Sequence, residues 1–320
     1  MKVYPYILFA LLFVFSCNKE DKEAQAIDKI EIDLNIERFD VAFSEASEEN
    51  LPELKAKYPF MFPEKFDDSF WLEQLKDTIQ QELSRETVKA FPSIDSEEDE
   101  IKQLFKHLKY YFPQFKTPRV ITTTSSVDHR NKVIVTDTIT LISLDTYLGS
   151  DHYFYQGIQD YLRADFNRDL MVVDMAEQYA EKFIFQGPRK RLLDDMIYSG
   201  KILYFKDKVI PFKTDAQKIS YTPEQLEWAK VNELYIWSYF VDRELLFSTD
   251  TKLANRFINS APFSKFYLEA IDNESPDKLG QYIGWQIVKS YMDNNEVTFN
   301  QLLNKSSDEI FNNAKFKPSR

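Results

Sequence analysis

The sequence predicts an α+β fold in which helices dominate and the sheet is small. Most of the chain repeats its apolar residues at helical spacing, whereas β-branched residues gather between about 119 and 145. Only 6 of the 320 residues are glycine, and no low-complexity tract or internal repeat interrupts the chain. We therefore expect residues 29–320 to form a single domain, helical at both ends with the sheet between them.

The first half of this domain should hold all of its strands. Residues 27–40 alternate apolar and polar side chains, as a half-buried strand does. Helical spacing then covers residues 66–91 and 96–112, with Ser96 as the expected N-cap of the second helix. Three further strands are expected in residues 119–127, 131–137 and 136–149. Their short connections favour an antiparallel or mixed sheet, whose candidate edge, Thr138 to Leu144, is either free or covered by a helix.

Later helices are marked by their capping residues. Each start has a Ser or Thr N-cap, followed by a proline in the first turn, by a glutamine three residues later, or by both. The three starts are Thr222 with Pro223 and Gln225, Ser275 with Pro276, and Thr298 with Gln301. The first helix should run to about residue 246, and the last should be short and terminal.

The N-terminus predicts export and lipid attachment. An apolar run from Ile7 to Phe15 is too short to span a bilayer, and it ends just before Cys17, the only cysteine. This arrangement resembles a bacterial lipobox, so residues 1–16 are interpreted as a lipoprotein signal peptide and Cys17 as the acylated mature N-terminus. Residues 17–28 are charged and should form a flexible tether. The alternative is an ordinary secretory signal.

Charge and composition exclude several classes of function. The net charge is -12, and acidic and basic residues are interspersed without a basic stripe. Nucleic-acid binding and adhesion to anionic lipid through a polybasic patch are therefore not expected. A lone cysteine also excludes an intramolecular disulfide.

Residues 171–185 have the frame of a zinc-peptidase helix. In zincin metallopeptidases, a small sheet leads to a helix with the motif H-E-x-x-H, whose histidines bind zinc while its glutamate activates the bound water. The corresponding residues here are Ala176, Glu177, Gln178, Tyr179 and Ala180. Alanine cannot bind a metal, and the three histidines of the chain are isolated from one another. No catalytic residue, metal or other cofactor is therefore expected.

The faces of this helix suggest packing rather than catalysis. An apolar stripe should pack against the sheet, and a neighbouring acidic stripe should be solvated. The apolar stripe consists of Val173, Ala176, Ala180 and Ile184, and the acidic stripe of Asp174, Glu177 and Glu181. For Glu177 the alternative is a buried remnant of an active site or a cation site. Among the other carboxylates, Asp195 should form a surface ion pair with Arg191, four residues before it.

Four stretches together resemble the GldB-type gliding-motility lipoproteins. They are the lipobox start, "ISLDTYLGSDHYFY", "LLDDMIYSGKILYF" and "LGQYIGWQIVKSYM". The resemblance implies an envelope lipoprotein needed for gliding, acting with other gliding or secretion proteins, and distantly related to predicted zinc peptidases. It transfers no catalytic residue, because both metal-binding positions are alanine.

The sequence thus predicts a lipid-anchored, degenerate zincin-like body at the periplasmic face or outer membrane. It would serve as a non-catalytic scaffold or partner-binding component, able to hold an extended peptide by backbone pairing. The alternative is a metal-dependent peptidase or another hydrolase with non-standard ligands.

Overall fold

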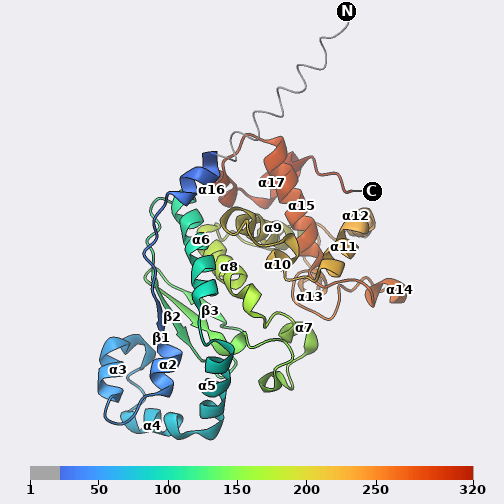
Figure 1. The fold of residues 1–320 in the computed structure, drawn as a ribbon. Helices are drawn as coiled ribbons and strands as arrows, with labels where there is room; N and C mark the ends of the chain where they lie inside the picture. The colour runs from blue at the N-terminus through green and yellow to red at the C-terminus, as the bar shows by residue number, and fades with distance from the viewer. Residues whose placement is uncertain (1–21, 320) are drawn as a thin grey trace, which may run out of the picture.

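The computed structural model describes residues 22–319. The predicted signal peptide, residues 1–16, and the predicted lipidation site Cys17 lie outside the described residues. The described chain is an α+β fold in which helices dominate, as the sequence predicts, with a four-stranded mixed sheet in its first half (Figure 1).

The sheet has the strand order β1-β2-β4-β3. The strands are β1 (Ile36–Arg38), β2 (Arg119–Thr123), β3 (Val133–Val135) and β4 (Ile139–Ser143). β1, β2 and β4 run parallel, and β3 is antiparallel to β4. A strand does form within residues 27–40, but it is much shorter than the alternating segment that predicts it.

The prediction that Thr138 to Leu144 forms an edge strand is wrong. This stretch contains β4, which lies between β2 and β3. A tight turn, in which the Thr136 amide donates to the Ile139 carbonyl at 2.8 Å, joins β3 and β4 as a hairpin. β4 also packs on both faces, because Ile142 belongs to one hydrophobic cluster and Leu141 packs against another. The edges of the sheet are therefore β1 and β3.

Helices cover both faces of the sheet, and a helical second half packs behind one of them (Figure 1). Phe39, Tyr58 and Phe62 form a small cluster with Ile121 on one face. The other face packs on α6, α8 and α9. The helices are α2 (Phe39–Ser44), α3 (Leu51–Lys57), α4 (Asp68–Lys76), α5 (Thr78–Ala90), α6 (Asp95–Tyr111), α7 (Asp160–Arg163), α8 (Met171–Phe183), α9 (Leu192–Val209), α10 (Asp215–Ile219), α11 (Pro223–Val231), α12 (Glu233–Asp242), α13 (Lys252–Phe257), α14 (Glu269–Asp272), α15 (Leu279–Asn294), α16 (Phe299–Leu303) and α17 (Ser307–Ala314).

Two of the predicted helix starts are confirmed. The Thr222 and Thr298 hydroxyls each accept a hydrogen bond from the backbone amide of the glutamine three positions later. The side chain of that glutamine accepts from the backbone amide of the threonine, so both capping boxes are complete. The helix expected in residues 221–246 nevertheless divides into α11 and α12 at Asn232, and α17 follows the helix that was expected to be terminal.

Other boundaries differ from the prediction. Asp77 accepts from the Gln80 amide, which starts a new helix and divides residues 66–91 into α4 and α5. α6 begins at Asp95, so Ser96 is not its N-cap. Ser275 does not open α15, because its hydroxyl donates to the Ser264 carbonyl at 2.9 Å. α15 begins at Leu279, after Lys278 in a left-handed conformation with φ 54°.

The predicted flexible tether is partly ordered. Residues 22–28 are helical, and Ile27 is only 4% exposed. Tyr111 at the end of α6 donates a hydrogen bond to Glu23, and Lys106 donates to the Asp28 carbonyl at 3.1 Å. A single buried isoleucine with two polar contacts therefore docks a segment whose composition alone indicates disorder.

α9 and α15 cross at close range in the second half. Gly200 and Gly284 face each other there, and a Cβ placed on Gly284 would lie 1.8 Å from the Met196 carbonyl oxygen. These two helices make the most extensive contact between any two helices of the described chain. The two glycines belong to two of the stretches that carry the family resemblance.

A buried lysine on α9 predicts an unusual pH dependence of stability. Lys201 is 5% exposed and donates to the Leu303 and Lys305 carbonyls at 3.3 and 2.5 Å. Burial lowers its pKa to about 8. The unfolded chain therefore binds the extra proton above pH 8, so this group's contribution to stability should rise with pH by about 1 kcal/mol per pH unit up to roughly pH 10.

This dependence is measurable by urea unfolding of the full chain and of Lys201→Met between pH 7 and 9.5. The difference between their free energies of unfolding should change in favour of the wild type as pH rises. A difference that stays constant over this range would contradict the lowered pKa.

Candidate binding cleft

The apolar stripe of α8 is buried as its spacing predicts. Val173, Ala176 and Ala180 are fully buried, and Ile184 is 2% exposed. All four belong to the cluster that includes sheet residues Val120 and Ile142. Ala176 and Ala180, the positions that would carry zinc ligands in a peptidase, therefore point into the core and do not line the cleft.

The acidic stripe is only partly solvated, which corrects the prediction. Glu181 is exposed, but Asp174 and Glu177 line a cleft of about 260 Å³ at the junction of the sheet half and the helical half. Its wall is built by the segment before β3, the segment before α8, α8 itself, α9, α10 and the start of α15. The side chains that face it include Lys132, Asp165, Asp174, Glu177, Lys206 and Lys278.

Most charges in this cleft are paired. Lys206 donates to Glu177 at 2.7 Å and to the Lys218 carbonyl at 3.1 Å, and only 3% of its side chain is exposed. Lys132 lies 2.5 Å from Asp174, which also accepts from the Tyr147 hydroxyl at 2.7 Å. These pairs hold α8 against α9 and against the β2–β3 connection.

The pairing sets the protonation of Glu177. Its side chain is 45% exposed toward the cleft, and the charge of Lys206 lowers its pKa despite partial burial. A general base that works near neutral pH usually needs a raised pKa. Glu177 is therefore a stable anion held by one ammonium group.

Sequence reasoning missed the lysines of this cleft. α9 is apolar on nearly all sides, yet it carries Lys201 and Lys206 at buried positions. A lysine buried in such a helix needs a hydrogen-bonding or charged partner, so its presence in the apolar segment could have indicated a buried polar contact. Asp165 and Lys278 could not be predicted in this way. They lie in turns and loops, where no helical spacing indicates which side chains face the cleft.

Other candidate residues lie elsewhere. Arg191 pairs with Asp194 at 2.6 Å, three residues on, and not with Asp195 as predicted. Asp194 closes a capping box at the start of α9, whereas Asp195 lies 3.8 Å from Arg189. Within residues 22–319, no group of three or more His, Cys, Asp and Glu side chains is arranged to hold a metal ion.

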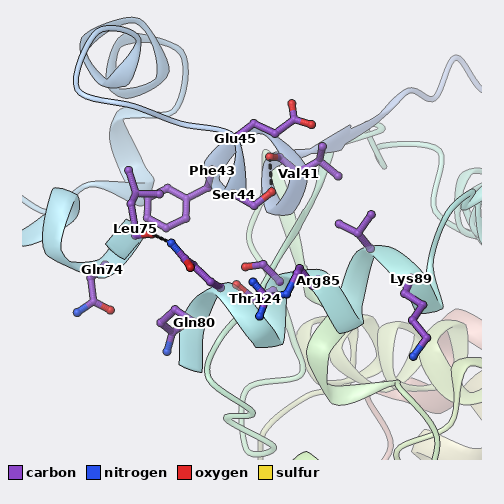
Figure 2. Close-up of a pocket in the computed structure, with 13 residues that line it drawn as sticks. Val41, Phe43, Ser44, Glu45, Gln74, Leu75, Gln80, Arg85, Lys89 and Thr124 are labelled. Carbon is purple, nitrogen blue, oxygen red and sulfur yellow. Dashed lines mark hydrogen bonds between the residues drawn. The ribbon is translucent and has the colours of Figure 1, made fainter. Parts of the chain in front are cut away.

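A second hollow, of about 510 Å³, lies between α2 and the pair α4 and α5 (Figure 2). Phe43 and Leu75 give it an apolar side, and Arg85 and Lys89 stand along α5. Ser44 donates to the Val41 carbonyl at 2.8 Å at its rim. No pattern in the sequence predicts this hollow.

Fold and cleft together define a helix-rich α+β protein with a charge-paired cleft beside a small mixed sheet. No helix within residues 22–319 is long and apolar enough to cross a membrane. A family model described as gliding motility protein GldB matches residues 20–318, and the chain belongs to this family. Membership gives the protein a role in gliding motility and a place at the membrane of the cell envelope. No curated protein and no solved structure matches the chain.

Proposed function

We propose that the protein acts in gliding motility as a lipid-anchored, non-catalytic component that binds other envelope proteins of the gliding or secretion machinery. The observation that carries the non-catalytic part is the ion pair of Glu177 with Lys206 at 2.7 Å. Lys206 occupies the carboxylate that would otherwise activate a water molecule. The buried packing of Ala176 and Ala180 supports the same proposal. The relation to zinc peptidases remains a prediction from the sequence.

Attachment through Cys17 is the second part of the proposal. The family match begins at residue 20, close to the lipobox cysteine, and the family is one of lipoproteins. Acyl chains on Cys17 would hold the folded body at a membrane surface. The partners would then be proteins at that same surface.

The two parts predict opposite outcomes for two substitutions in gliding cells. Glu177→Gln should leave colony spreading and single-cell gliding speed unchanged, because a glutamine oxygen still accepts from Lys206 and no catalytic base is lost. Cys17→Ser should abolish gliding and release the protein from the membrane fraction. Asn18→Ser serves as the matched control and should behave as the wild type.

Immunoblots of membrane and soluble fractions establish that each variant accumulates. A Glu177→Gln protein that accumulates normally but stops gliding would favour a hydrolase and contradict the non-catalytic part. A Cys17→Ser protein that stays in the membrane fraction and supports gliding would contradict the anchor. Crosslinking in intact cells, followed by identification of captured proteins, tests for the expected envelope partners.

A further inference from the structure

Lys278 and Asp165 form an open ion pair in the cleft. Lys278 Nζ lies 3.9 Å from Asp165 Oδ2 and 3.8 Å from Asp277 Oδ2, both too far for a hydrogen bond. Within the described residues, no hydrogen bond engages Lys278 Nζ or the Asp165 carboxylate. Lys278 is only 7% exposed, and both residues line the cleft. A buried ammonium and a nearby carboxylate thus keep unused hydrogen-bonding capacity on the same cleft wall.

The backbone here is held in an uncommon conformation. Ser220 and Lys278 both line the cleft, and both have a left-handed backbone, with φ 55° and 54°. Such conformations are costly for residues other than glycine and are found more often at binding sites. At Lys278 the turn before α15 fixes where the ammonium group lies.

Burial and neighbouring charges shift the pKa of both groups. Burial by itself would lower the pKa of Lys278, but the carboxylates of Asp165 and Asp277 raise it above the ordinary value. Burial raises the pKa of Asp165, and Lys278 and Lys132 oppose that rise. A ligand beside this pair meets an ammonium group and a carboxyl group on the same cleft wall.

The other charges and the volume of the cleft further restrict the class of ligand that it can bind. The other cations that line the cleft are Arg130, Lys132, Lys206 and Lys218, and each already has a carboxylate partner. A polyvalent anion would therefore find only the Lys278 ammonium group without a hydrogen bond. An apolar ligand would leave the Lys278–Asp165 pair without hydrogen bonds. A cleft of about 260 Å³ is below the usual range for drug-sized ligands. A small molecule with one positive and one negative group fits these limits.

We propose that this cleft binds a free α-amino acid, whose carboxylate accepts from Lys278 Nζ and whose ammonium donates to Asp165. The ligand bridges the open pair, so that the buried ammonium and the partly exposed carboxylate each gain a hydrogen-bonded partner of opposite sign. Glu177 lines the same cleft, where Lys206 holds its carboxylate. This binding is a function additional to the anchoring and partner binding proposed above.

The test uses the purified full chain in detergent and three related probes. Alanine carries both charges, N-acetyl-alanine lacks the ammonium, and alaninamide lacks the carboxylate. Titration calorimetry should give saturable binding of alanine and at least about tenfold weaker binding of the other two, because each loses one charge-assisted hydrogen bond. Absence of alanine binding, or equal binding of all three probes, would overturn the inference.

Substitutions locate the binding. Lys278→Gly removes the ammonium, and glycine adopts the left-handed backbone without strain, so the variant should fold. Asp165→Asn removes the negative charge and keeps the side-chain shape. Each should weaken alanine binding at least about tenfold. The matched control is Lys315→Gly, since Lys315 has φ 53° and is exposed beyond α17. It should bind alanine as the wild type does.

Thermal unfolding of each variant shows that it is folded before binding is measured. A folded Lys278→Gly protein that binds alanine as tightly as the wild type would place the ligand elsewhere and overturn the inference. This outcome would leave the anchor and the envelope partners untouched, because those are tested in gliding cells through Cys17 and by crosslinking.

Discussion

Gly284→Ala should destabilise the protein by about 3 kcal/mol or more. In an ordinary helix, replacing glycine by alanine stabilises by up to about 1 kcal/mol, so the expected sign is reversed here. The added Cβ would lie 1.8 Å from the Met196 carbonyl oxygen and 2.5 Å from its carbon. These are backbone atoms of α9, which cannot rotate away, so α9 and α15 must separate along their shared length.

Urea unfolding followed by circular dichroism measures this loss. Gly187→Ala is the matched control, because the nearest atom to its added Cβ is 3.4 Å away, on the exposed ring of Phe185. The control should differ from the wild type by less than about 1 kcal/mol. Equal stability of Gly284→Ala and the wild type would mean that the two helices do not cross as closely as described.

The second large effect is expected from Asp145→Ala, at about 3 kcal/mol. Asp145 is fully buried and accepts from the Ser125 amide at 3.0 Å and the Val127 amide at 2.7 Å. Ser126 and Val127 both have positive φ, which is rare for a β-branched residue. Without the carboxylate, two amides lose their acceptor and the strained loop after β2 loses its anchor.

Asp145→Asn should cost less than Asp145→Ala, since its amide oxygen still accepts from the loop. Asp151→Ala, an exposed aspartate in the same stretch, should leave stability within about 0.5 kcal/mol of the wild type. Chemical denaturation of the three variants gives this order. If Asp145→Ala unfolded at the same urea concentration as Asp151→Ala, the loop would not depend on the carboxylate.

Local patterns predicted the elements of the fold better than their arrangement. The β-branched block and the capping boxes at Thr222 and Thr298 are local features, and the structure has both. The order of the strands is not local, since it depends on the β3–β4 hairpin inserting β4 beside β2. The docking of residues 22–28 also escaped prediction, because it depends on the distant side chains of Lys106 and Tyr111.

The candidate site was predicted in part for the same reason. Helical spacing assigned Ala176 and Ala180 to the core face and Glu177 to its neighbour, and the structure keeps these faces apart. Helical spacing could not predict that Lys206 pairs with Glu177, 29 positions away, or that Lys278 lies near Asp165. Charges that meet only after folding leave no spacing in the sequence to detect.

The docked segment of residues 22–28 fixes how far the protein can reach. With the acyl anchor proposed at Cys17, five peptide steps lie between the lipidated residue and residue 22, so the two are at most about 18 Å apart. The C-terminal end of α6, which holds this segment through Tyr111, would then stay next to the lipid headgroups. An anchor of this length would keep the folded body beside the membrane that carries the acyl chains.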